Sequence, residues 1–388
     1  MTRGDQDTFA GRIANPRSDG VVYGPGVGRS ELPALLERVG ASRPFLVTTP
    51  SLERSGLAAD VAGWLGDGCA GTFAGSREHT PAPVVIEAAD AAGAADADCL
   101  VSLGGSSVVD LTKGVALLLG EGGALADHRM QRGTPRPELR APKVPHIAVP
   151  TTLSGAEFTA VAGITDPTAG EKQMYLDPQL LPRWVVFDSV LAASCPARLW
   201  AATGMKVVAD TIEVLCARRA NPQTDALALG ALQLLVDNLG PATADATDHH
   251  ARGRCQFAVA MVFPQLAAVG IGLVAALRHQ LGGGLGVPHG EASTIVLPHV
   301  MRFNLPAAAG HYQRAATALG LSTPEELIAR IESLTIELGL PVRLSAVGVS
   351  RTDLDGAVVD HVLADGSSRG NIAPVDADAV RRVLDAAY

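Results

Sequence analysis

Several features that define whole classes of protein are missing from this sequence of 388 residues. Its five cysteines lie far apart and form no CxxC pair, which argues against a zinc or iron–sulfur cluster and suits a reducing compartment. Basic tracts are absent and the net charge is −9, so the surface is unsuited to nucleic acid or an anionic membrane. No apolar run reaches the roughly 18 residues of a membrane span, and the polar first residues lack the apolar core of a signal peptide. We expect a soluble, cytoplasmic protein whose partner is a small molecule, with no role for nucleic acid or membrane.

Aromatic residues are also scarce, at 4% of the chain, although hydrophobic residues as a whole reach 47%. Leu, Val and Ala must therefore build most of the core. The first half alternates short apolar runs with helical patterns, which predicts a doubly wound, Rossmann-like α/β domain with a mostly parallel sheet. Strands are expected at 21–24, 45–48, 71–73, 99–103, 146–150 and 184–188.

Helical patterns dominate the second half, after about Pro196, and strand signals become rare there. Helices are expected at 199–218, 224–239, 252–281, 308–319, 323–338 and 351–364. We therefore predict two domains, an α/β nucleotide-binding domain over residues 1–193 and an all-helical domain over residues 194–388, with a cleft between them. The segment 121–140 mixes charged residues with proline and is expected to be an exposed loop.

A glycine turn follows the most apolar of these strands. The run 99–103 leads into Gly104-Gly105-Ser106-Ser107, and from Val108 onward the apolar residues recur at helical spacing. A strand that breaks on glycines and opens a helix can bind an anion, because free backbone N–H groups and the positive end of the helix dipole meet there. The spacing is neither the GxGxxG fingerprint nor a Walker loop, and it also fits an ordinary connection. In a parallel sheet, this turn and the loop beginning at Thr151 would both lie at the carboxyl ends of strands, where ligands bind.

Three segments together resemble the iron-containing, or group III, alcohol dehydrogenase family. The glycine turn with Asp110 and Lys113 is similar to the family's GGGSxxDxxK loop, with Ser106 in place of the third glycine. The stretch 150–157 is similar to its PTTxxGxE segment, and 287–300 is similar to its PHG…LPHV signature. The resemblance covers nearly the whole chain and implies a dehydroquinate synthase-like architecture, an NAD(P)-dependent oxidoreductase and a homodimer formed through the N-terminal strands. It assigns cofactor contacts to Gly104, Gly105, Ser106, Ser107, Asp110, Thr151, Thr152, Ser154, Lys172 and Thr49.

Within this family the sequence is most similar to the maleylacetate reductase branch, through the segments 21–24, 49–50 and 79–81. Most dehydrogenases of the family have an aspartate near the position of Thr49. A carboxylate there would repel a 2′-phosphate, and Thr49 removes that repulsion. The resemblance therefore implies that NADPH is accepted as well as NADH.

The sequence departs from the family at its metal site. That site uses an Asp and a His four residues apart on one helix, followed by two later His residues. The first two positions here are Lys206 and Asp210, the third is Ala275, and only His289 is retained beside the further family histidine His279. A protonated lysine and an alanine cannot ligate a metal, and one imidazole with one carboxylate are too few to hold a divalent ion. We therefore predict that no iron or zinc is bound.

The same substitutions suggest a replacement for the metal. The Lys206 ammonium, held by Asp210 one turn along the helix, could polarise a substrate carbonyl, and His279 or His289 could supply the proton. Other interpretations stay open, because an i,i+4 ion pair is often only a solvated surface pair and buried histidines are often structural. Two arginines, Arg278 and Arg302, could bind a substrate carboxylate or form salt bridges.

The function predicted first is a metal-independent, NAD(P)H-dependent reduction of a carbonyl or enone-type substrate, with a carboxylated substrate implied by the resemblance alone. A non-redox lyase, dehydratase or cyclase on the same scaffold is the alternative, in which Lys206 could form a Schiff base. A third interpretation is an inactive family member that serves as a binding subunit.

Overall fold

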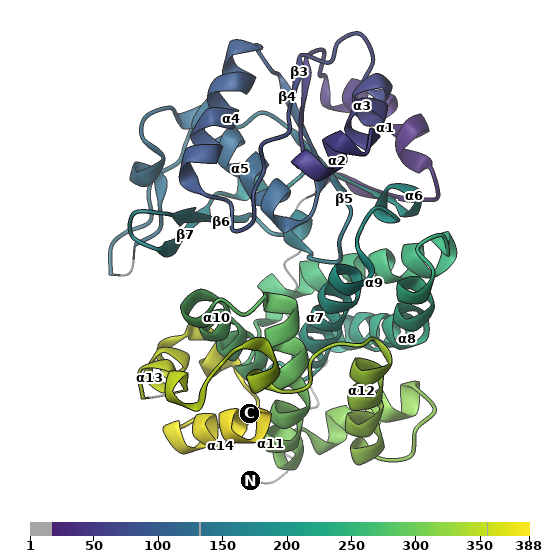
Figure 1. The fold of residues 1–388 in the computed structure, drawn as a ribbon, viewed down its shortest axis with the longest axis vertical. Coiled ribbons are helices and arrows are strands. Elements are labelled where there is room, and N and C mark those ends of the chain that lie inside the picture. Colours follow the sequence, from purple (N-terminus) through teal and green to yellow (C-terminus); the bar gives the residue numbers. More distant parts are fainter. Residues whose placement is uncertain (1–17, 132, 355) are drawn as a thin grey trace.

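The computed structural model describes residues 18–131, 133–354 and 356–388. An α/β part occupies the upper half of the molecule in Figure 1 and a helical part the lower half. Among the helices in the described ranges, none has the length and apolar character needed to cross a bilayer.

Six parallel strands form the main sheet, in the order β1-β8-β5-β4-β2-β3. Strands β2, β4 and β5 are buried along their whole length, as expected for a sheet covered on both faces. This confirms the doubly wound α/β prediction. The strands are β1 (Gly20–Gly24), β2 (Pro44–Val47), β3 (Gly71–Phe73), β4 (Cys99–Gly104), β5 (His146–Pro150) and β8 (Trp184–Asp188).

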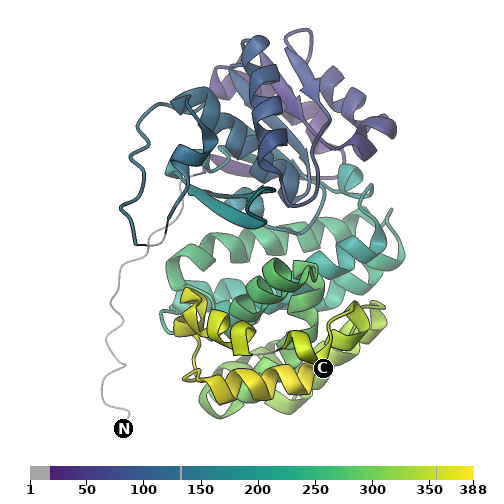
Figure 2. The ribbon, with the colours of Figure 1, turned by 60° about the vertical axis from the view of Figure 1, so that its left-hand side comes forward.

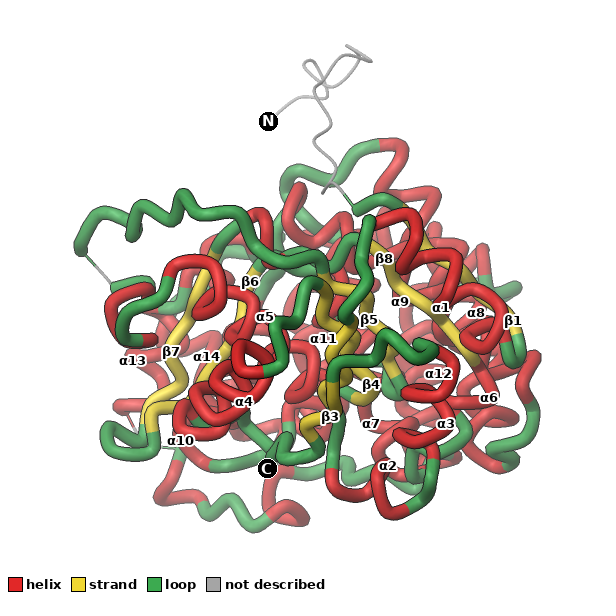
Figure 3. Tube along the Cα trace, turned by 90° about the horizontal axis from the view of Figure 1, so that it is seen from above, coloured by secondary structure: helices red, strands yellow, loops and turns green. Residues whose placement is uncertain are grey.

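Helices cover both faces of this sheet, as the view from above shows (Figure 3). Successive residues of β4 point to opposite faces: Leu100 packs in a cluster with residues of α4 and α5, whereas Val101 packs in a cluster with residues of α1 and α3. These helices are α1 (Val27–Val39), α2 (Pro50–Arg54), α3 (Leu57–Trp64), α4 (Ala82–Ala94) and α5 (Ser106–Glu121).

The strand order contains a switch point between β2 and β4. From β2 the chain moves outward to β3 and then returns to β4 on the other side of β2, so the loops after β2 and β4 lead away from each other. Thr48, directly after β2, donates its hydroxyl to Leu103 O at 2.9 Å and holds the two strand ends together. A crevice at such a point is where ligands bind in open α/β sheets.

An antiparallel hairpin, β6 (Val161–Asp166) and β7 (Glu171–Leu176), was not expected from the sequence. Most of β7 is polar and half-exposed or exposed, so it lacks the apolar pattern that marks the other strands. The hairpin lies at the edge of the α/β part that faces the helical part (Figures 1 and 2). The described residues of segment 121–140 that follow the end of α5 are loop, as predicted, apart from a short 3-10 helix at Leu125–His128.

Nine helices of the described residues follow β8, and most of them pack around one large apolar cluster. Two predicted helix boundaries are wrong. The helix expected at 252–281 is two helices, because Gly270 has a φ of 84° and the chain breaks there. The helix expected at 308–319 is the end of a 30-residue helix that continues through Pro298 and Pro306. The helices are α6 (Ser189–Ala192), α7 (Ala197–Leu215), α8 (Pro222–Ala244), α9 (His249–Val269), α10 (Leu273–Leu285), α11 (His289–Ala318), α12 (Pro324–Glu337), α13 (Gly356–Ala364) and α14 (Ala377–Ala387).

Candidate active site

The glycine turn after β4 forms one half of the candidate cofactor site. Gly104 has a φ of 151°, and a Cβ at Gly105 would lie 3.1 Å from Thr152 Oγ1. Ser106 and Ser107 begin α5, and no described side chain caps the first turn of this 16-residue helix. The glycines therefore allow a ligand to approach the positive end of α5 closely.

The loop after β5 forms the other half. Gly104 pairs with Pro150 in the parallel ladder, and Thr151 N donates to Gly104 O at 3.0 Å, so the two loops lie side by side. The buried hydroxyl oxygens of Thr152 and Ser154 have no hydrogen-bond partner among the described residues. Buried polar groups normally have a partner, so these two fit a site whose partner is a bound ligand.

Thr49 lies on the other side of the switch point, at the end of β2. Its hydroxyl caps α2 by accepting from Leu52 N at 3.2 Å, and it lies 2.9 Å from the Ser51 hydroxyl. Two hydroxyl groups therefore occupy the position where the family resemblance implies a carboxylate in most dehydrogenases.

Asp110 and Lys113 on α5 contact protein groups in this structure. The carboxylate of Asp110 accepts from Gly163 N at 3.2 Å and lies 3.8 Å from Lys113 Nζ. Lys113 is fully buried and donates to Ala156 O at 2.7 Å and to Val161 O at 2.9 Å. These contacts hold the Thr151 loop and strand β6 against α5. The structure thus gives Asp110 a positioning role, and the cofactor contact expected for it stays a prediction.

The side chain of Lys172 on β7 passes over Gly163 on the neighbouring strand β6. A Cβ at position 163 would collide with Lys172 Cε and would lie 2.8 Å from its Nζ. The charge of Lys172 reaches residues on two other elements. Burial raises the pKa of Asp110 on α5 against the opposing charges of Lys113 and Lys172. Burial, Arg278 and Lys172 together lower the pKa of His289 on α11. Gly163 therefore provides the space in which the end of the Lys172 side chain lies.

Gly163→Ala should move the Lys172 ammonium and weaken cofactor binding by roughly tenfold, the size of one charge-assisted hydrogen bond. The contact is with the flexible end of Lys172, so we expect stability to change little. Fluorescence titration with NADPH and NADH measures the effect. Gly93→Ala is the matched control, because a Cβ there meets Leu119 at an ordinary 3.5 Å. An unchanged Kd in Gly163→Ala would contradict the role of Gly163.

Three charged side chains meet where the family resemblance implies a metal. Lys206 Nζ and Arg278 Nη1 each lie 2.8 Å from a different carboxylate oxygen of Asp210. The Asp210 side chain is fully buried, that of Arg278 is 5% exposed and that of Lys206 is 16% exposed. Burial raises the pKa of Asp210, but Arg278 and Lys206 outweigh it and hold that pKa below its ordinary value. We call this arrangement the ion triplet; it binds both oxygens of Asp210 and leaves Lys206 as its most accessible member.

Lys206 also connects the ion triplet to the Thr151 loop. Its ammonium donates to Ser154 O at 3.3 Å and lies 4.4 Å from the centre of the Phe263 ring. Gly155, with a φ of 76°, packs so closely on that ring that a Cβ would collide with it. The glycine of the PTTxxGxE segment therefore allows the Thr151 loop to meet the helical part directly beside Lys206.

The two candidate histidines lie near each other, with ring centres 6.2 Å apart. His289 begins α11; burial, followed by the charge of Arg278, lowers its pKa to about 3. It is therefore neutral at pH 7. His279 on α10 is more accessible, with 39% of its side chain exposed, and its Nδ1 lies 2.9 Å from Asp365 Oδ2. His279 is thus the better placed of the two to exchange a proton with solvent.

Comparisons with known proteins identify the family of this chain. The profile of the iron-containing alcohol dehydrogenases matches residues 19–189, and that of the Fe-containing alcohol dehydrogenase family, C-terminal, matches residues 200–388. The chain belongs to this family. It is 32% identical to maleylacetate reductase of Burkholderia cepacia, with 95% of each chain covered, and 31% identical to NAD-dependent methanol dehydrogenase of Bacillus methanolicus, with 84% and 87% covered. A crystal structure of 1,3-propanediol oxidoreductase superposes with a TM-score of 0.89 at 27% identity, covering 97% of this chain and 100% of that one. The predicted NAD(P)-dependent oxidoreductase of the iron-containing alcohol dehydrogenase family is confirmed at this level.

The iron that the family name implies does not fit the residues of this chain. Both oxygens of Asp210 are bound to cations, and Ala275 presents only a buried methyl group. In the described ranges, no three His, Cys, Asp or Glu side chains are arranged to hold a metal ion. A divalent ion at this position would compete with Lys206 and Arg278 for the oxygens of Asp210 and would lie against their positive charges.

The sequence indicated most of the residues of this site, but it left two roles open for Arg278 and Arg302 and gave no sign of Phe263 or Asp365. It offered Arg278 as a substrate anchor or a salt bridge, and the structure shows the salt bridge, to Asp210. Arg302 forms an exposed pair with Glu332 at 2.7 Å. Phe263 and Asp365 gave no signal, because their contacts with Lys206 and His279 span 57 and 86 positions of the sequence.

Proposed function

We propose that this chain reduces a carbonyl or enone-type substrate with NADPH or NADH and without a metal ion. The observation that carries the proposal is the ion triplet of Lys206, Asp210 and Arg278, whose two cations bind both oxygens of Asp210. A bound metal would polarise the carbonyl and stabilise the developing alkoxide. The Lys206 ammonium performs that task here, because a positive group in a largely buried position stabilises a developing negative charge effectively.

The net charge of the ion triplet supports this replacement. A divalent ion held by one aspartate and three neutral histidines has a net charge of about +1. Lys206, Arg278 and Asp210 together also carry a net charge of +1 when all three are ionised. The electrostatic environment offered to a developing alkoxide is therefore similar in sign and size, although the groups that provide it are different.

The cofactor fits the site between the glycine turn and the Thr151 loop. When bound there, the reduced nicotinamide supplies a hydride. The start of α5 and the free hydroxyls of Thr152 and Ser154 would hold its phosphates, Lys172 would add a positive charge, and Thr49 would tolerate a 2′-phosphate.

The substrate class is suggested by the relatives rather than by the site. Maleylacetate reductases at 30–33% identity suggest a substrate that carries carboxylates. We expect a homodimer, and the support in the structure is that β1 is an edge strand whose Tyr23 is 62% exposed. We also expect the enzyme to act in the cytoplasm.

A second candidate is the non-redox reaction through a Schiff base on Lys206. Burial lowers the pKa of Lys206, although Asp210 opposes this shift. A neutral amine is the nucleophile that a Schiff base requires. Borohydride added in the presence of a carbonyl substrate, followed by peptide mass spectrometry, would leave a stable adduct on Lys206 if this candidate is correct, and none if the reductase proposal is.

The decisive experiment combines metal analysis with an activity assay. Purified protein is analysed for iron and zinc by mass spectrometry, and the oxidation of NADH and NADPH is followed with maleylacetate before and after treatment with EDTA. We expect less than one tenth of a metal ion per chain and equal rates before and after chelation. Stoichiometric metal, or a rate abolished by EDTA and restored by iron, would refute the metal-free proposal. No binding of either nucleotide would refute the reductase proposal itself.

A further inference from the structure

The segment that follows α13 folds back onto α10 and places a carboxylate beside His279. Asp365 begins the short 3-10 helix Gly366–Gly370, and its two oxygens have different partners. Oδ1 accepts from Ser367 N at 2.8 Å, and Oδ2 lies 2.9 Å from His279 Nδ1. One oxygen therefore fixes the carboxylate in its own turn, and the other contacts the imidazole of His279.

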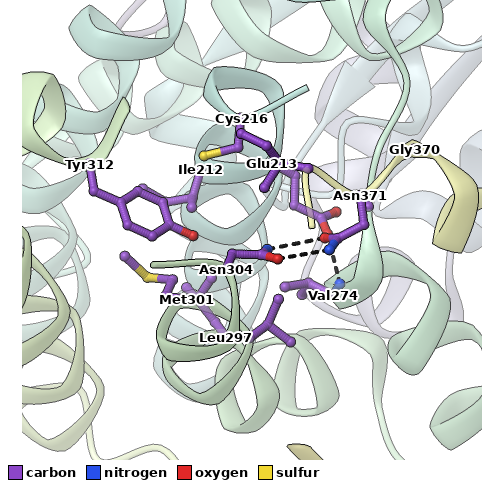
Figure 4. Close-up of a pocket in the computed structure, with 13 residues that line it drawn as sticks. Ile212, Glu213, Cys216, Val274, Leu297, Met301, Asn304, Tyr312, Gly370 and Asn371 are labelled. Carbon is purple, nitrogen blue, oxygen red and sulfur yellow. Dashed lines mark hydrogen bonds between the residues drawn. The ribbon is translucent and has the colours of Figure 1, made fainter. Parts of the chain in front are cut away.

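The end of this segment is anchored firmly next to the start of α10. The side chains of Asn371 and Asn304 face each other and exchange hydrogen bonds of 2.7 and 3.1 Å (Figure 4). Leu273 N also donates to Asn371 Oδ1, and Arg218 Nε donates to Asn371 O at 3.0 Å. The pocket beside these residues has a volume of about 10 Å³, which is enough for one water molecule and not for a substrate. The pocket is therefore part of the packing around Asn371. The hydrogen bonds of Asn371 fix the end of the segment that carries Asp365.

The hydrogen bond from His279 to Asp365 determines which ring nitrogen is free. An ionised carboxylate only accepts hydrogen bonds, so Nδ1 must carry a proton and Nε2 is left for exchange. Burial raises the pKa of Asp365, but the hydrogen bonds from His279 and Ser367 outweigh it and hold that pKa well below its ordinary value. Asp365 therefore stays ionised at neutral pH, and the tautomer of His279 is constant.

We propose that Asp365 is the positioning residue of the reductase reaction: it holds His279 so that Nε2–H donates the proton to the product oxygen. This proposal rests on the proposed function. The carbonyl carbon receives the hydride of the reduced nicotinamide, which is thereby oxidised. The carbonyl oxygen then takes the proton from Nε2 of the His279 imidazolium. The neutral imidazole that remains keeps its Nδ1–H bond to Asp365 and regains a proton from solvent, to which its side chain is 39% exposed.

The test compares Asp365→Asn with the wild type in the full-length enzyme. Asparagine can still accept from Ser367 N, but it then presents its NH₂ group to His279 and favours the wrong tautomer. We expect kcat to fall by roughly tenfold to a hundredfold, with the KM for NADPH and NADH unchanged. Asp376→Asn is the matched control, since Asp376 caps α14 through Ala379 N at 2.7 Å and contacts no histidine among the described residues; it should keep the wild-type kcat.

A double mutant shows whether Asp365 acts through His279. If it does, Asp365→Asn will cause no further loss of kcat in a His279→Gln background. A full additional loss in that background, or a wild-type kcat for Asp365→Asn alone, would overturn the proposal.

A spectroscopic measurement separates this proposal from the proposed function. The ¹⁵N chemical shifts of the His279 ring report its tautomer without any turnover, and we expect Nδ1 to be protonated in the wild type and not in Asp365→Asn. An inactive wild type with the expected tautomer would refute the reductase function and leave the pairing intact. An unchanged tautomer in Asp365→Asn would refute the positioning role whatever the activity.

Discussion

Replacing Lys206 by methionine will lower kcat by roughly tenfold or more and leave nucleotide affinity nearly unchanged. Methionine has a similar length and fills the space over Phe263, but it removes the more accessible of the two cations of the ion triplet. Arg278 then remains paired with Asp210 and is too deeply buried to stabilise an alkoxide at the position of the Lys206 ammonium. Steady-state kinetics and nucleotide titration of the wild type and the variant measure the two quantities separately.

The control for this substitution is another buried lysine. Lys143 is fully buried and pairs with Glu121 at 2.7 Å and Asp177 at 3.1 Å, on the α/β part and away from the ion triplet. Lys143→Met should therefore reduce stability without reducing kcat. If Lys206→Met has the kcat of the wild type, the Lys206 ammonium has no part in the reaction. If both variants lose kcat equally, the loss reflects a damaged fold.

The parts of this fold that could be predicted are those whose signal is local in sequence. Strand β4 is a continuous apolar run that ends on two glycines, and the structure places it at the centre of the sheet with α5 starting at Ser106. The i,i+4 spacing of Lys206 and Asp210 likewise predicted their contact, since one helical turn brings such side chains together.

The parts that could not be predicted depend on contacts between distant segments. Strand β7 is defined by its pairing with β6 and by Lys172 crossing Gly163, and its own polar sequence indicates only a loop. The sequence also left Arg278 open as a substrate anchor, because its partner Asp210 lies on another helix and their contact is visible only in the fold. The sequence could therefore indicate that the metal ligands are lost. Only the fold shows that two cations, Lys206 and Arg278, bind the same carboxylate.

That arrangement should make Asp210 important for stability as well as for activity. Asp210→Asn leaves Lys206 and Arg278 facing each other without a countercharge in a largely buried place, and we expect it to lower the free energy of unfolding by about 3–5 kcal/mol at pH 7. The pH dependence has a definite sign. The pKa of Asp210 is lowered in the folded protein, so its contribution is present above the unfolded-state pKa, near 3.8, and is lost as the pH falls through the folded-state value. Urea unfolding curves should therefore show a large difference between wild type and variant at pH 7, which shrinks on acidification below about pH 4.

An exposed ion pair provides the comparison. Glu332→Gln breaks the Arg302–Glu332 pair, which has a similar N–O distance of 2.7 Å but side chains 49% and 36% exposed. Solvent screens such a pair, so its loss should cost less than about 1 kcal/mol and depend on salt. A cost for Asp210→Asn as small as that for Glu332→Gln would mean that Lys206 and Arg278 do not need the countercharge of Asp210. A difference between wild type and Asp210→Asn that does not shrink at all as the pH falls from 4 toward the folded-state pKa of Asp210 would mean that the ionisation of Asp210 is not its cause, since protonation removes the charge that distinguishes the two chains.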